Sequence, residues 1–160
     1  MAIILSFSFI MTGYIFIIPF PFYLNTLRNT IIAISEENRK IKANNVWLLL
    51  IPVWNVFYQY IVITNLTRSL NFEFKKRGIT YSYENPAYVF GMLYCTMFII
   101  CCIPFIIDYS TSTGISDILN IIGYIIWAVG IIFWILFWIK TNNYKNILKD
   151  GLSTTEPNKN

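Results

Sequence analysis

The sequence has no histidine and few charged residues, and each scarcity excludes a class of protein. Histidine is the commonest general base, proton relay and transition-metal ligand, so its absence argues against those chemistries. Charged residues make up 12% of the chain, whereas soluble domains carry roughly 25%. Hydrophobic residues reach 56% and aromatic residues 18%. This composition excludes a disordered chain and indicates a membrane-embedded domain.

Cysteine is also scarce, and Cys95, Cys101 and Cys102 lie in one apolar stretch. They lack the spacing of a zinc site, a redox site or a disulfide framework. Buried thiols behave as small hydrophobic groups, so we interpret these three as packing residues. The chain also lacks a glycine-rich phosphate loop, a GxSxG elbow and a zinc-protease helix motif. We therefore expect no enzymatic activity, no cofactor and no metal.

Four apolar segments cover about residues 2–24, 46–64, 87–107 and 115–139. Each is long enough to cross a hydrocarbon core of about 30 Å as a helix. All four are too long for the alternating strands of a membrane barrel. We predict an all-α integral membrane protein: a four-helix transmembrane bundle with short amphipathic connecting helices, in one domain over 1–145. A polar, flexible tail is predicted over 146–160.

The first two segments contain prolines that bear on their shape. The first lacks the basic start and small-residue cleavage site of a signal peptide, so we expect a retained helix broken at its far end by Pro19 and Pro21. The second is kinked at Pro52 or re-entrant there. Apolar residues at every fourth position and a basic run before Gly78 predict that its helix extends to Arg77.

The connection between the first two segments has an apolar face. Its members follow helical spacing: Leu27, Ile31, Ile34 and Ile41. This pattern favours a short amphipathic helix lying in the membrane interface, and the alternative is a solvated linker.

Basic residues retained in short loops mark the cytoplasmic side of a membrane protein. They lie in the first connection (Arg28, Arg39, Lys40, Lys42), the second (Arg68, Lys75, Lys76, Arg77) and the tail (Lys140, Lys145, Lys149, Lys159). Four full spans with both termini inside leave only the first group outside. A re-entrant second segment with the N-terminus outside places all 12 in the cytoplasm. Both models predict a cytoplasmic C-terminus, and they differ in the side of the N-terminus.

Polar side chains inside the segments are few. Asn55 and Gln59 are four residues apart and face the same way on a helix. They could line a pore or form an interhelical hydrogen-bond clamp, for which Ser8 and Thr12 on the first segment are the expected partners.

Small residues form two further stripes, interpreted as helix-packing seams. One contains Asn120, Gly123 and Gly130, and the other contains Gly91, Cys95 and Cys102. No charged residue lies within the core of a segment, which argues against ion-coupled transport. A passive pore needs no such charge.

The stretch from Ser35 to Gly78 contains ENRK, then VWLLLIPVWN, then SLNFEFKKRG. It resembles small bacterial multi-pass membrane proteins with that pattern, to which no activity is assigned. The resemblance implies a four-segment fold and no site residue.

These observations favour a non-enzymatic protein of the bacterial inner membrane, a structural or accessory subunit of an assembly or homo-oligomer. Membrane lipids and other membrane subunits or further copies are the expected partners, and nucleic acid is not. The alternatives are a homo-oligomeric pore or membrane-perturbing effector, and then an uncoupled carrier of small solutes or lipid.

Overall fold

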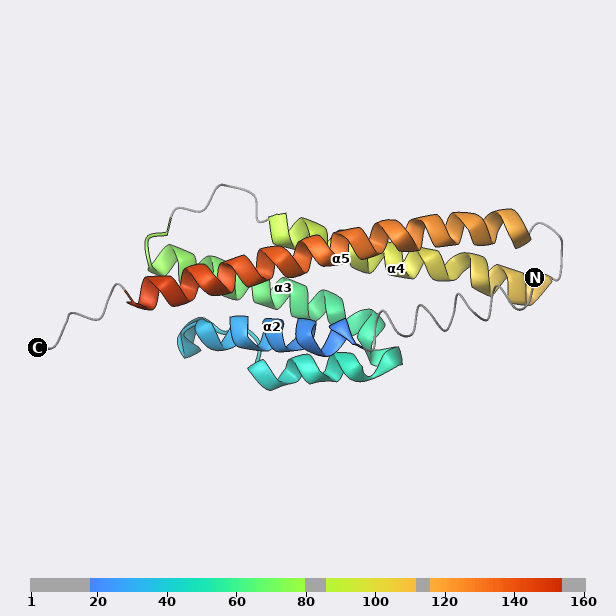
Figure 1. Ribbon diagram of the computed structural model, residues 1–160. Coiled ribbons are helices and arrows are strands. Elements are labelled where there is room, and N and C mark those ends of the chain that lie inside the picture. The colour runs from blue at the N-terminus through green and yellow to red at the C-terminus, as the bar shows by residue number, and fades with distance from the viewer. Residues whose placement is uncertain (1–17, 80–85, 112–115, 154–160) are drawn as a thin grey trace, which may run out of the picture.

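The computed structural model describes residues 18–79, 86–111 and 116–153. Its elements keep the labels of Figure 1: α2 (Pro19–Ala33), the 3-10 helices η1 (Glu36–Asn38) and η2 (Ala43–Leu50), α3 (Pro52–Lys76), α4 (Pro86–Thr111) and α5 (Ser116–Ser153). No strand occurs within these ranges, in agreement with the predicted all-helical class. Within the described residues, one helical stretch, Ile121–Asp150 in α5, is long and apolar enough to cross a membrane.

Helix α2 begins where the sequence suggested that a helix ends. Pro19 occupies the first turn of α2, and Ile18 precedes it as the N-cap residue. Proline suits that position because its fixed φ matches the helix and its missing N–H would have no partner there. The two prolines therefore lie in the first turn of a helix that continues to Ala33, beyond the predicted end of the segment at residue 24. Residues 2–17 of that segment lie outside the described residues.

The apolar face predicted for the first connection is buried by protein. Leu27, Ile31 and Ile34 are no more than 1% exposed, and Ile41 is 7% exposed. Helix α2 packs against η2 and α5, which explains this burial. The face is therefore neither a lipid-facing surface nor part of a solvated linker.

The second apolar segment is not one helix. Its first part belongs to η2, Ile51 is extended with φ −82° and ψ 111°, and α3 then begins at Pro52. A residue before proline avoids the α conformation, which accounts for the break at Ile51. The chain reverses there, so η2 and α3 run in opposite directions (Figure 1). The backbone therefore turns back at Ile51 and does not continue as a single kinked helix.

Helix α3 ends as its sequence predicts. Gly78 has φ 64°, a left-handed conformation that favours glycine. Its N–H donates to the carbonyl of Lys75, and the N–H of Ile79 donates to the carbonyl of Phe74. These two bonds form a Schellman motif, which satisfies carbonyls in the last turn of the helix.

The two longest helices form an antiparallel hairpin. Helices α4 and α5 make the most extensive contact in the fold, while α2 packs on α5 and α3 packs on α4. Figure 1 shows the hairpin extending well beyond α2, η2 and α3 on one side. At the other side the C-terminal ends of α2, α3 and α5 come together.

Helix α5 also extends beyond its predicted limits. The fourth segment was expected to end near residue 139, with a flexible tail from 146, but α5 continues to Ser153. Leu148 is fully buried, and its carbonyl accepts a hydrogen bond from Arg77. This contact joins the last turns of α5 to the end of α3.

Candidate functional site

Asn55 and Gln59 lie at the contact between α3 and α4. The Gln59 side-chain amide donates to the Asn55 side-chain oxygen, and the Gln59 oxygen accepts from the Cys95 thiol at 3.3 Å. Cys95 is 2% exposed. The pair thus forms a hydrogen-bond contact between helices, with Cys95 of α4 as the partner. The partners expected from the sequence, Ser8 and Thr12, lie outside the described residues.

Two other contacts between helices were not predicted from the sequence. The hydroxyls of Tyr60 and Thr96 are 3.3 Å apart, and the Trp138 indole donates to Thr26 Oγ at 2.9 Å. Spacing within one helix carries no information about which other helix lies opposite. A single sequence therefore offers no signal for these pairs.

Gly91 and Gly130, one from each predicted seam, lie at close helix contacts. A Cβ atom at Gly91 would lie 2.8 Å from Ile63 of α3 and 3.1 Å from Phe137 of α5. A Cβ atom at Gly130 would lie 3.2 Å from Met97 of α4. Gly91 therefore marks a junction of three helices, whereas Gly130 permits the close approach of α4 and α5.

The rest of the seams is only partly described. Gly123 is buried in α5. The side chains of Cys102 and Asn120 lie outside the described residues.

The interior beside these glycines is filled with aromatic rings. Tyr23 of α2 contacts Trp134, Phe137 and Trp138 of α5 edge to face, with ring centroids 5.3 to 6.2 Å apart. The buried hydroxyls of Tyr23 and Tyr94 are 3.0 Å apart and form a hydrogen bond. Each of these two tyrosine hydroxyls thus has a hydrogen-bond partner inside an otherwise apolar core.

The strongest concentration of polar contacts is at the end where α2, α3 and α5 meet. Its centre is the carboxylate of Glu73, which is 1% exposed. One oxygen accepts from Ser35 Oγ at 2.8 Å and from Arg77 Nε at 2.7 Å. The other accepts from the Ser35 N–H at 3.2 Å and from Asn38 Nδ2 at 2.7 Å. We call Ser35, Asn38, Glu73 and Arg77 the Glu73 cluster.

These hydrogen bonds decide the protonation state of Glu73. Burial by itself raises the pKa of a carboxyl group. The hydrogen bonds from Asn38, Ser35 and Arg77 outweigh burial and hold the pKa of Glu73 below its ordinary value. Glu73 is therefore a buried, ionised carboxylate whose two oxygens both have donors.

Arginine side chains extend this cluster to the ends of the helices. Arg77 donates to the carbonyls of Leu148 at 2.7 Å and of Ala33 at 3.4 Å. Arg39 donates to the carbonyls of Ile34 and Ile32 at 2.7 and 2.8 Å. The two guanidinium groups thus satisfy carbonyls left without partners at the end of α2 and connect that end to α3 and α5.

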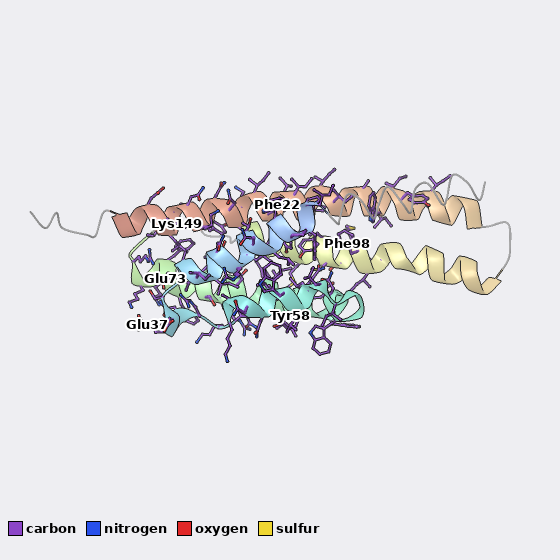
Figure 2. The ribbon with its side chains drawn as sticks, turned by 60° about the horizontal axis from the view of Figure 1, so that its bottom comes forward. Phe22, Glu37, Tyr58, Glu73, Phe98 and Lys149 are labelled. Carbon is purple, nitrogen blue, oxygen red and sulfur yellow. The ribbon has the colours of Figure 1, made fainter. Side chains whose placement is uncertain are left out.

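Sequence reasoning missed the Glu73 cluster, although a signal was present. The signal is the position of Glu73 in the sequence. It lies three residues after Leu70, on the buried face of α3, and four residues before Arg77, the residue with which it pairs. The lysines of the same run are exposed, and Lys76 pairs with the exposed Glu37. Figure 2 shows Glu37, Glu73 and Lys149 at one end of the molecule, far from Phe98.

In the part of the chain that the structure describes, no group of three or more acidic or cysteine side chains could hold a metal ion. Compared with known proteins, the chain matches no family model, no curated protein and no solved structure.

Proposed function

We propose that the chain is a non-enzymatic, multi-pass protein of the bacterial inner membrane, acting as a structural or accessory subunit of a membrane assembly or homo-oligomer. The observation that carries this proposal is the amount of large apolar surface left exposed. Exposed examples on η2, α3 and α5 are Trp47, Leu50, Trp54, Phe57, Ile125 and Ile132. Soluble monomers rarely expose large contiguous apolar patches.

The candidate span in α5 supports the membrane assignment. Only 22% of its most apolar stretch is buried within the protein. The core helix of a soluble protein would be covered on most sides, whereas lipid or partner helices can cover this one. Its 30 residues extend about 45 Å, more than the hydrocarbon core needs.

The charge distribution supports a cytoplasmic position for the Glu73 cluster. Basic residues lie at the end of α3, between η1 and η2, and in the last turns of α5, and these parts lie at the same end of the molecule. In this topology η2 and α3 form a re-entrant hairpin that enters the membrane and returns. The C-terminus is then cytoplasmic, as is every basic residue.

Cysteine labelling in intact cells tests this topology. In a background without the native cysteines, Glu36→Cys and Lys75→Cys should both be labelled from the cytoplasm, whereas Ser116→Cys should be labelled from outside. Both residues are exposed: Glu36 precedes the hairpin of η2 and α3 in the sequence, and Lys75 lies near its end. Labelling of the first two positions from opposite sides would show instead that the second segment spans.

A subunit role is supported by the uneven coverage of α4 and α5. Of the described elements, only these two extend past the turn that joins η2 to α3 (Figure 1). Three isoleucines of α5 before Trp127 are exposed: Ile121, Ile122 and Ile125. Such a surface can pack against helices of other subunits or of further copies.

Mass spectrometry after gentle solubilisation tests this role, because it reports copy number and partner subunits together. We expect an oligomer or a complex with another membrane protein. Ile121→Ser with Ile125→Ser should dissociate it, while Ile132→Ser with Ile139→Ser, two exposed positions nearer the cytoplasmic end, should not. A monomer without partners would contradict the proposal.

The pore alternative is less well supported, because Gln59 is engaged by Asn55 and Cys95. Planar bilayer recordings distinguish the two functions. Channels that disappear in Asn55→Leu would favour the pore and overturn the subunit proposal.

A further inference from the structure

A pocket of about 440 Å³ lies at the segment that connects η1 to η2. It is lined by Glu36, Arg39, Lys40, Ile41, Lys42 and Ala43. Three of these residues are basic and one is acidic, so the pocket has a positive charge. That charge suits an anionic ligand.

The basic side chains differ in how far they are committed elsewhere. Arg39 is largely engaged by backbone carbonyls, and its Nη1 is 3.6 Å from the exposed carboxylate of Glu36. The Lys40 ammonium lies 5.1 Å from the ring centre of Phe72. Lys40 and Lys42 are both exposed. The two lysines are therefore the side chains that can reach a ligand in the pocket, whereas Arg39 is held by backbone carbonyls.

An apolar surface continues directly from this pocket. Helix η2 starts at Ala43, and Trp47, Leu48 and Leu50 along it are 39 to 53% exposed. Eight residues of 3-10 helix extend about 16 Å, close to half of a hydrocarbon core of about 30 Å. The length of η2 is therefore close to the thickness of one hydrocarbon leaflet. A molecule whose charged group lies in the pocket could extend its apolar chains along η2 through that leaflet.

We infer that this pocket binds the phosphate-bearing headgroup of an anionic phospholipid, whose acyl chains lie along the exposed face of η2. The inference rests on the proposed re-entrant position of η2 and α3, and it adds a specific ligand to that arrangement. Lysine supplies a compact charge for the phosphate, and the Trp47 indole lies at the depth where headgroup meets acyl chain. Arg28, whose Nε donates to Asn44 at 3.3 Å, adds positive charge beside the start of η2.

The test uses the full-length protein in an uncharged mild detergent. Short-chain phosphatidylglycerol is titrated in, and native mass spectrometry counts the protein molecules that retain it. Phosphatidylcholine of the same chain length is the neutral comparison, and glycerol phosphate is the same charge without chains. We expect phosphatidylglycerol to bind more tightly than either.

The key variant is Lys40→Gln with Lys42→Gln. Each lysine near an anionic lipid contributes about fivefold in affinity, so removing both charges should weaken phosphatidylglycerol binding by about 25-fold. The matched control, Lys145→Gln with Lys149→Gln, removes the same charge from α5 at the same end of the molecule. It should change binding by less than about twofold, and melting temperatures should show that both variants are folded.

Three results would overturn the inference. Equal binding of phosphatidylcholine would remove the role of charge, and equal binding of glycerol phosphate would indicate a site for free phosphoesters. An equal loss in the α5 control would indicate general charge attraction. None of these results alters the copy number or partners found after solubilisation, so failure of the lipid site is distinguishable from failure of the subunit proposal.

Discussion

The two halves of the molecule are held together by different forces. At the end where α2, α3 and α5 meet, a buried carboxylate and two guanidinium groups join the helices through charge-assisted hydrogen bonds. Along the middle, packed rings, close glycine contacts and neutral hydrogen bonds join them. Removing one partner of a buried charge leaves the other charge unpaired, whereas removing a neutral contact can be relieved by repacking. Substitutions should therefore be most costly at the charged end.

Arg77→Ala should have the largest effect, a loss of about 3 kcal/mol of stability, because it leaves Glu73 buried without its cation. It also removes donors from the carbonyls of Leu148 and Ala33. Thermal unfolding in mild detergent measures the change. Lys76→Ala is the neighbouring control, since its exposed pair with Glu37 should contribute no more than about 1 kcal/mol. Equal losses in both variants would remove the distinction between the two ends.

Gly130→Leu should come next and test the apolar half. A Cβ atom at this position is already 3.2 Å from Met97, so the larger leucine side chain should push α4 and α5 apart. Overpacking of this kind costs about 1–3 kcal/mol. The control is Ala128→Leu, which adds the same side chain at an exposed position of α5. If both variants were as stable in detergent as the unaltered protein, the close contact at Gly130 would not support the fold.

Acid should weaken the charged end selectively. The pKa of Glu73 is below its ordinary value of about 4.5, so its ionised form favours folding. That contribution is fully present above pH 4.5 and is lost as the pH falls through the lower pKa of the folded state. Melting temperatures measured through this acid range should therefore fall less steeply in Glu73→Gln than in the unaltered protein. Glu36→Gln, at a 92% exposed side chain, should retain the original slope.

Gln59→Leu should have the smallest effect. It removes the hydrogen bond that links α3 to Cys95 of α4, and such bonds contribute roughly 0.6 kcal/mol in membranes. Because Gln59 is only partly buried, leucine can pack in its place without leaving a charge unpaired. A loss approaching that of Arg77→Ala would show that this neutral contact matters as much as the charged cluster.

Local signals in the sequence were read correctly where one interaction dominates. The end of α3 at Gly78 follows from a glycine after basic residues, and the extents of α4 and much of α5 follow from long apolar runs. The start of α2 at Pro19 was not predicted, because a proline can end one helix or begin the next and its own sequence context suits both. The continuation of α5 to Ser153 was missed because Leu148 is held by α3, and nothing adjacent to Leu148 in the sequence indicates that contact.

For the candidate sites too, spacing along the sequence predicted some residues but not their partners in other helices. The spacing of Asn55 and Gln59 placed them on one face, and the glycine spacing identified residues at close helix contacts. Their partners, Cys95, Ile63 and Met97, could not be found from spacing within one helix. In the Glu73 cluster, Ser35 and Glu73 are 38 positions apart in the sequence, and a contact over that distance is not indicated by spacing within one helix.

The sequence by itself determined the all-helical class and the positions of the apolar segments, since both depend on composition and on spacing along one chain. Only the tertiary structure decided that the chain reverses at Ile51 and does not continue as a kinked helix. Pro52 is compatible with a reversal and with a kink, and the packing of η2 on α2 selects the reversal. It likewise decided that a charged residue in α3 is buried. Glu73 is ionised there because three residues donate hydrogen bonds to its carboxylate. Ser35 and Asn38 come from the segment between α2 and η2, and Arg77 lies at the end of α3.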